Sequence, residues 1–151
     1  MPTHYRGTPE EILALDAFIK LSRSVNAVQG RLLPTLQKDF GLTESQFAVM
    51  EALYHLGPLQ QGELCRKILR SGSNVTTVVD NLERDGMVRR VRDEADRRIQ
   101  IVHLTDQGRA LLMKTLPNHV GRVVQLMSAL EPDEQRELGR LCRKLGRAIS
   151  S

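Results

Sequence analysis

The feature that most constrains the fold of this chain is residues 71–86, a stretch that mixes small polar and β-branched residues. Its aliphatic residues recur at helical spacing and define one stripe, formed by Val75, Val78, Val79 and Leu82. The other positions carry short polar or charged side chains: Ser73, Asn74, Thr76, Thr77, Asp80, Asn81 and Arg84. The pattern predicts a helix that packs on a core by one side and presents a polar surface on the other.

Both ends of this helix are predicted by the sequence. The hydroxyl of Ser73, or that of Ser71, can accept a hydrogen bond from the free backbone N–H groups of the first turn. Gly86 can adopt the left-handed conformation that ends a helix, and Met87 can then pack back onto Leu82. Because valine and threonine are mediocre helix formers, burial of the stripe has to stabilise the segment.

A basic hairpin is predicted directly after this helix. Residues 88–92 alternate as a strand does, residues 93–96 have the composition of a turn, and residues 97–104 return as a second strand. The polar side of a single helix is often only solvated, and that interpretation stays open here. The adjacent arginine-rich hairpin instead favours a helix and a wing that contact the same partner.

The segment before the polar helix predicts two further helices. Thr43 and Gln46 form a capping box at the start of one, residues 57–58 are a Gly-Pro pair that ends it, and residues 61–69 form a second, short helix. Helix, turn, helix and hairpin, in this order, make a winged helix-turn-helix. We therefore expect residues 41–105 to form such a module in a mainly α chain of the α+β type.

Positive charge is concentrated around the polar helix and the hairpin. The chain has a formal net charge of +4, and nine basic but only six acidic residues lie between residues 66 and 98. This excess favours contact with phosphates. Aromatic residues make up only 3% and tryptophan is absent, which disfavours stacking on single-stranded bases. The expected partner is double-stranded DNA.

Long helices are predicted on both sides of the winged module. Thr8 and Glu11 form a capping box for the first. Two more follow the hairpin: residues 104–108 cap a long helix that runs through Leu130, and Pro132 opens a last helix with apolar residues as far as Ile149. Their apolar stripes are longer than the small module can cover. A second copy of the chain would cover them, in a two-fold homodimer that presents two polar helices to one face of DNA.

This pairing defines the expected domain organisation. Residues 1–40 and 106–151 would form a helical dimerisation region, and residues 41–105 the DNA-binding domain. A monomeric bundle that covers its own stripes is the alternative.

The sequence gives little support for a membrane, metal or cofactor partner. No run has the length and apolarity of a signal peptide or a membrane span, so a cytoplasmic protein is expected. Cys65 and Cys142 lack the spacing of a zinc site or a redox motif and are expected to be small buried residues. The four histidines are scattered without ligand spacing, so neither a metal nor a cofactor is expected.

An ordered set of short motifs resembles the MarR family of bacterial transcriptional regulators. The set comprises Leu42-Thr43-Glu44-Ser45-Gln46-Phe47, Leu56-Gly57-Pro58, residues 73–86, Asp96-Arg97-Arg98, and Val102-His103-Leu104-Thr105 with Gly108. The resemblance spans nearly the whole chain. It implies an obligate homodimer that binds a palindromic operator and usually represses nearby genes until a small molecule or an oxidant releases it.

The resemblance also implies which side chains contact DNA. The residues that would face the major groove are Ser71, Ser73, Asn74, Thr76, Thr77 and Asn81. Arg98 would enter the minor groove, oriented by a charge-assisted pair with Asp96. The other arginines of the wing would meet phosphates: Arg89, Arg90, Arg92 and Arg97.

An effector pocket is implied between the dimerisation helices and the winged lobe, since similar family members respond to phenols or quinones and others bind anionic aromatics. The candidate lining residues are Phe18, Arg23, Met50, Tyr54 and His55, for which ordinary core packing is the alternative. The hydroperoxide-sensing branch of the family has a reactive cysteine where this chain has Leu15. Cys65 is then the candidate for a thiol sensor.

Two other classes of function stay open on the sequence. A winged helix can serve protein contacts or architectural, sequence-indifferent DNA binding without any effector. A cysteine-dependent enzyme is the other class, with Cys65 or Cys142 as nucleophile. The sequence carries no recognisable base, phosphate loop or metal motif to accompany such a nucleophile, so it favours the DNA-binding regulator over an enzyme.

Overall fold

The computed structural model describes residues 3–68 and 74–150. Within these residues the chain forms α1 (Pro9–Phe40), α2 (Glu44–Leu56), β1 (Leu59–Gln60), α3 (Gln61–Lys67), α4 (Val75–Arg84), β2 (Val88–Arg92), β3 (Gln100–Leu104), α5 (Asp106–Met127) and α6 (Pro132–Ser150). The predicted fold class is confirmed: the chain is mainly helical, with a small antiparallel sheet in a winged helix-turn-helix. None of the helices in these two ranges has the length and apolarity needed to cross a membrane.

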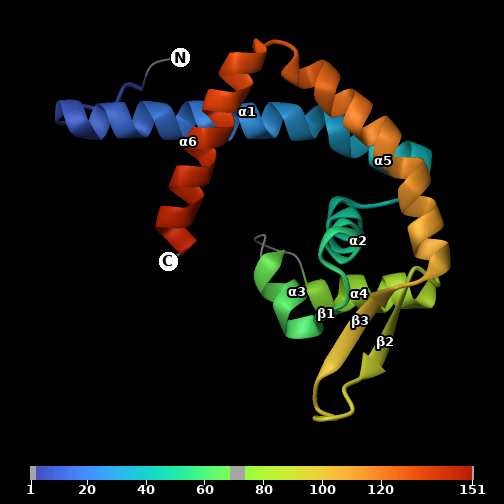
Figure 1. Cartoon of the computed structure of the whole chain (residues 1–151). Helices are drawn as coiled ribbons and strands as arrows, with labels where there is room; N and C mark the ends of the chain where they lie inside the picture. The colour runs from blue at the N-terminus through green and yellow to red at the C-terminus, as the bar shows by residue number, and fades with distance from the viewer. Residues whose placement is uncertain (1–2, 69–73, 151) are drawn as a thin grey trace.

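The long helices frame the winged module. In Figure 1, α1 runs across the top, α5 follows an arc down one side, and the group of α2, α3, α4 and the sheet lies below, with the β2–β3 hairpin protruding from it. The C-terminal part of α1 packs on α5, where Nη2 of Arg122 donates to Oδ2 of Asp39 at 3.0 Å. α6 crosses α1 in this view, and none of its residues is buried.

The three strands form one antiparallel sheet in the order β1-β3-β2. β1 was not predicted, because a strand of two residues shows no periodicity. The predicted start of the second wing strand at Arg97 is wrong, since β3 begins at Gln100. The N–H of Ile99 donates to the carbonyl of Asp96 at 3.0 Å, which places Arg97 and its neighbour in the turn.

The apolar stripe of α4 packs as predicted. Val75, Val79 and Leu82 are buried, and Val78 is half-buried against the same core. The core that receives them also contains Met50, Leu53, Leu64, Val88, Val102 and Leu112. It therefore joins the three helices of the module to the wing and to α5.

The predicted end of α4 is confirmed, whereas its start differs. Gly86 has φ 78°, and the N–H of Met87 donates to the carbonyl of Leu82 at 2.8 Å, as in a helix closed by a left-handed glycine. At the start, Oδ1 of Asn74 accepts from the N–H of Thr77 at 3.3 Å. Asn74 is therefore the cap of the helix. Neither predicted cap, Ser73 or Ser71, belongs to the described residues.

Thr105 and Gly108 hold the start of α5 against the turn that follows α4. Oγ1 of Thr105 donates to the carbonyl of Gly86 at 2.6 Å and accepts from the N–H of Gly108 at 3.0 Å. A Cβ atom on Gly108 would lie 2.1 Å from the carbonyl oxygen of Met87, a distance that two such atoms cannot adopt. The Leu-Thr-x-x-Gly motif is thus the joint between the wing and the helical frame.

This joint predicts that Gly108→Ala destabilises the fold. We expect a loss of about 1 to 3 kcal/mol in the free energy of unfolding, because the added methyl group forces two backbone segments apart. Denaturant unfolding followed by circular dichroism measures the change.

Gly121→Ala is the matched control. Gly121 lies in the same helix with open space around its Cβ position, so alanine should be neutral or slightly stabilising there. Equal stability of the two variants would contradict the close approach at Gly108.

Candidate nucleic-acid interface

The polar side of α4 faces outward, which is the basic requirement for reading a groove. Thr76, Thr77 and Asp80 are exposed, and Asn81 is half-buried. Asn74 is exposed too, but its side-chain oxygen already accepts the capping hydrogen bond, so chiefly its amide N–H groups could meet a base. The two predicted serine contacts, Ser71 and Ser73, lie outside the described residues.

Arg98 extends into solvent from the turn of the wing and is held there by Asp96. Nε of Arg98 donates to Oδ1 of Asp96 at 3.1 Å, and Nη2 donates to Oδ2 at 3.1 Å. The backbone N–H of Arg98 also donates to Oδ1 at 3.1 Å. The side chain of Arg98 is 90% exposed, so the pair orients the guanidinium without burying it. This is the geometry expected of an arginine that enters a groove.

The electrostatics of this pair follow from its hydrogen bonds. The Arg98 guanidinium holds the pKa of the Asp96 carboxyl below its usual value, and Asp96 in turn raises the pKa of Arg98. Asp96 therefore stays ionised at neutral pH, and the charge pairing is lost only as the pH falls through this lowered pKa.

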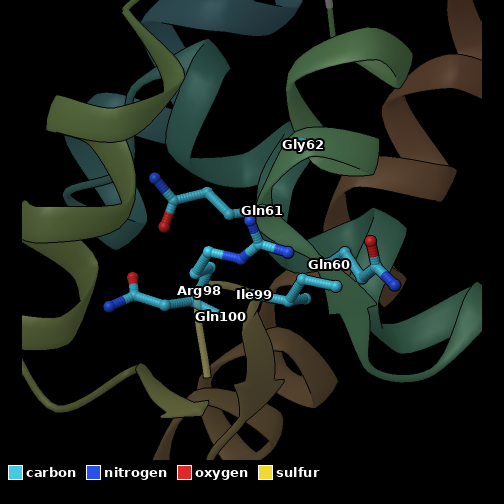
Figure 2. Close-up of a pocket in the computed structure, with 6 residues that line it drawn as sticks. All are labelled: Gln60, Gln61, Gly62, Arg98, Ile99 and Gln100. Carbon is cyan, nitrogen blue, oxygen red and sulfur yellow. The ribbon is translucent and has the colours of Figure 1, made fainter. Parts of the chain in front are cut away.

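An open hollow lies between the turn of the wing, where β3 begins, and the start of α3. It encloses about 330 Å³ and is lined by Gln60, Gln61, Gly62, Arg98, Ile99 and Gln100 (Figure 2). Three glutamines beside an arginine suit a sugar-phosphate backbone better than an apolar ligand. Gln60 and Gln61 could not be predicted as candidate contacts, because only the pairing of β1 with β3 brings them next to the wing.

The remaining arginines of the wing fall into two groups. Arg89, Arg92 and Arg97 are exposed, as phosphate contacts have to be. Arg90 is different: its side chain is only 14% exposed, and its guanidinium forms ion pairs with α4. The expectation that Arg90 meets a phosphate does not fit this geometry.

The residues expected to line an effector pocket occupy different environments. Met50 is completely buried in the core, which supports the alternative reading for this residue. Phe18 is 64% exposed on α1, and Arg23 is exposed on the same helix. Tyr54 packs half-buried against the core, with the guanidinium carbon of Arg109 5.6 Å from its ring centroid.

His55 borders a second hollow, of about 370 Å³, beside α2 and the end of α3. The lining residues are Ala48, Glu51, Ala52, His55, Leu56, Lys67 and Ile68. Nε2 of His55 lies 3.7 Å from Oε1 of Glu51, and its ring makes an edge contact with Tyr54 at 5.0 Å between centroids. Among the candidates for effector binding, the sequence neighbours Tyr54 and His55 have rings in contact, and His55 borders the hollow.

The two cysteines differ in exposure. Cys65 is half-buried against the core, close to what was expected. Cys142 is exposed, so the expectation of burial is wrong for it, because α6 packs no residue fully within this chain. In residues 3–68 and 74–150, no three His, Cys, Asp or Glu side chains gather as a metal site would need.

An exposed polar helix, a wing and a solvent-directed arginine together define a winged helix-turn-helix DNA-binding protein. The MarR family model matches residues 42–100. The chain is 40% identical over 109 residues to YkoM of Bacillus subtilis, an uncharacterised HTH-type transcriptional regulator, covering 72% of this chain and 71% of that protein. It is 33% identical over 135 residues to the B. subtilis HTH-type transcriptional regulator MhqR, covering 88% and 91%. The chain belongs to the MarR family and is a DNA-binding transcriptional regulator.

Solved structures agree with this assignment. Sco3205 of Streptomyces coelicolor, a MarR family regulator in complex with DNA, superposes with a TM-score of 0.82 at 27% identity, covering 100% of this chain and 94% of that one. BpsR of Bordetella bronchiseptica, whose DNA binding is regulated by 6-hydroxynicotinic acid, gives 0.71 at 25% identity over 84% and 98%. The curated relatives are transcriptional regulators, which points away from a cysteine-dependent enzyme.

The wing geometry predicts that Arg98→Ala weakens DNA binding by about tenfold or more, because an arginine that reads a groove contributes roughly 1 to 3 kcal/mol. Fluorescence anisotropy with a labelled duplex measures the dissociation constant. Arg136→Ala removes the same charge from the exposed surface of α6 and should leave the affinity within about twofold.

The same variant tests the pairing itself. In an NMR titration the carboxyl of Asp96 should show a pKa below its usual value in the wild type, and this pKa should rise in Arg98→Ala. An unchanged Asp96 titration would mean that the arginine is not held by this carboxylate in solution.

Proposed function

We propose that two copies of this chain form a cytoplasmic homodimer that binds a palindromic operator and represses transcription from it. The observation that carries this proposal is the exposed polar surface of α4 together with Arg98, which Asp96 holds in solvent on the wing. α4 would occupy the major groove, where short hydroxyl and amide side chains reach base edges. Arg98 would occupy the adjacent minor groove.

The other predicted contacts take roles that fit their positions. The side chains proposed for the major groove are Ser71, Ser73, Asn74, Thr76, Thr77 and Asn81, with Asn74 also capping the helix. Arg89, Arg92 and Arg97 would bind phosphates, and a backbone segment would pass over the hollow beside Gln60 and Gln61.

Exposed apolar side chains on the frame helices support the homodimer. They are Ile12, Leu13, Phe18 and Val25 on α1, Met113, Val120 and Val124 on α5, and Leu138, Leu141, Leu145 and Ile149 on α6. Soluble monomers rarely expose so long an apolar surface, and a second copy offers the same surface in return. Residues 1–40 and 106–151 would then be the dimerisation region, and residues 41–105 the DNA-binding domain.

A charged residue in this surface should separate the subunits. Leu141→Glu is expected to raise the dimer dissociation constant at least about tenfold, because it buries an unpaired carboxylate in an apolar interface. Analytical ultracentrifugation measures the dissociation constant. Arg147→Glu places the same group on the opposite side of α6 and should leave the dimer intact. Dimers of unchanged strength in Leu141→Glu would locate the interface elsewhere.

Sequence specificity separates a repressor from an architectural DNA-binding protein. A duplex that the wild-type protein selects from a random-sequence pool is labelled and challenged with an excess of random duplex. A repressor's complex survives this competition, because specific binding exceeds non-specific binding by about a thousandfold or more. Loss of the complex at equimolar competitor, or failure to select any sequence, would favour the architectural role.

We further propose that a small aromatic ligand or an oxidant releases the protein from DNA. The support for this release is the nearness of Tyr54 and His55, whose rings could contact a phenolic or anionic aromatic molecule, together with the regulation of BpsR by 6-hydroxynicotinic acid. Cys65 is the candidate if the signal is an oxidant.

Release by a ligand and release by an oxidant are distinguished by adding either a hydroxybenzoate or hydrogen peroxide to the preformed protein–DNA complex. A hydroxybenzoate should release DNA from the wild type and from a Cys65→Ala/Cys142→Ala variant alike, because ligand binding needs neither thiol. Gel-shift titration measures the release. If instead only hydrogen peroxide acts, and only on the wild type, the sensor is a cysteine.

A further inference from the structure

We propose that Arg90 is a positioning residue, which sets the wing against α4 and contributes to DNA recognition without touching DNA. The inference rests on the proposed sequence-specific DNA binding, because it assigns a role within that same surface. It also replaces the phosphate contact that the sequence suggested for this arginine.

All three nitrogens of the Arg90 side chain are engaged within the protein. Nη2 donates to Oδ1 of Asp80 at 2.5 Å, Nη1 donates to Oε1 of Glu83 at 3.1 Å, and Nε donates to Oε1 of Gln61 at 2.8 Å. Nη2 also lies 3.4 Å from the carbonyl oxygen of Thr76. Because most of its N–H groups already have acceptors within the protein and its side chain is only 14% exposed, Arg90 has few donors left for a phosphate.

The acceptors come from separate elements, so the guanidinium joins them. Arg90 lies on β2, Asp80 and Glu83 lie on α4, and Gln61 begins α3. Glu83 is held a second time, because its Oε2 accepts from the backbone N–H of Arg90 at 2.8 Å. A tilt of the wing relative to α4 would break several of these charge-assisted bonds together.

The same cluster reaches into the surface proposed to read the major groove. Nε2 of Gln61 lies 3.3 Å from Oγ1 of Thr76 and can donate to it, so Arg90 and Gln61 together fix the position of that hydroxyl group. Arg90 also neutralises Asp80 and Glu83, two carboxylates that would otherwise stand next to DNA phosphates. The first effect favours the specific complex, whereas the second favours every duplex alike and is kept by any cation at this position.

Substitution by lysine separates a positioning role from a phosphate contact. Lysine keeps the charge and can still meet a phosphate, but it lacks the planar fork that binds three acceptors at once. Arg90→Lys should weaken binding to the selected duplex by about tenfold, while affinity for random duplex and its salt dependence stay within about twofold of the wild type. Arg140→Lys, which alters a two-bond pair with Glu137 on α6 and so lies outside the proposed DNA-binding surface, should change neither affinity more than about twofold.

Glu83→Gln provides a second test, in which the change of charge alone would raise the affinity for DNA. Removing a negative charge from a DNA-facing helix should by itself strengthen binding to every duplex. If Glu83 is needed to hold Arg90, binding to the selected duplex falls while binding to random duplex holds or rises. Thermal unfolding of each variant checks that the fold is retained, and Glu83→Gln decides the question if Arg90→Lys does not fold.

These measurements separate failure of the positioning role from failure of the proposed function. The proposal is overturned if Arg90→Lys binds the selected duplex like the wild type, if it loses both duplexes equally with a weaker salt dependence, or if Glu83→Gln strengthens both. A wild-type protein that selects no sequence refutes the proposed function and this inference with it. A wild type that does select, with variants that select equally well, refutes the inference alone.

Discussion

Burial of one stripe of α4 determines how the rest of the molecule can act. Because Val79 and Leu82 lie in the core, the hydroxyl and carboxylate side chains on the other sides of the helix have to face out. The left-handed Gly86 ends the helix, and the close approach at Gly108 then sets where the wing leaves the module and where α5 begins. A hydrophobic constraint thereby places a polar helix and a basic hairpin on one surface.

The two halves of the chain satisfy the hydrophobic effect differently. The winged module buries its aliphatic side chains within a single core. The frame helices do so only in part: Leu36 of α1 and Leu112 of α5 join that core, whereas α6 buries no residue and Ile149 near its end is 76% exposed. Within a single chain, the apolar side chains of the winged module are therefore mostly buried. Many of those on the frame helices stay exposed, on the surface where a second copy would bind. The proposed dimer would bury these exposed side chains and would present two α4 helices to DNA at a fixed separation.

Local signals in the sequence predicted most of the fold. Capping residues and helical spacing placed the helix starts at Thr8 and Thr43 and the end of α4, because these features depend on near neighbours along the chain. Strand β1 and the hollow it forms with the wing could not be predicted, since they depend on pairing between distant segments. Arg90 shows the same limit. The alternating pattern of the wing strand predicts an exposed arginine, and only the fold brings Asp80, Glu83 and Gln61 around it.

In the proposed complex each subunit contacts a major groove through α4 and the adjacent minor groove through Arg98. Dimethyl sulfate modifies guanine N7 in the major groove and adenine N3 in the minor groove, so methylation interference on the selected duplex tests both contacts in one measurement. We predict two symmetric sets of interfering positions about one helical turn apart, each with guanine N7 sites flanked by adenine N3 sites. Interference confined to one groove, or to a single unrepeated stretch, would contradict the placement of α4 and Arg98.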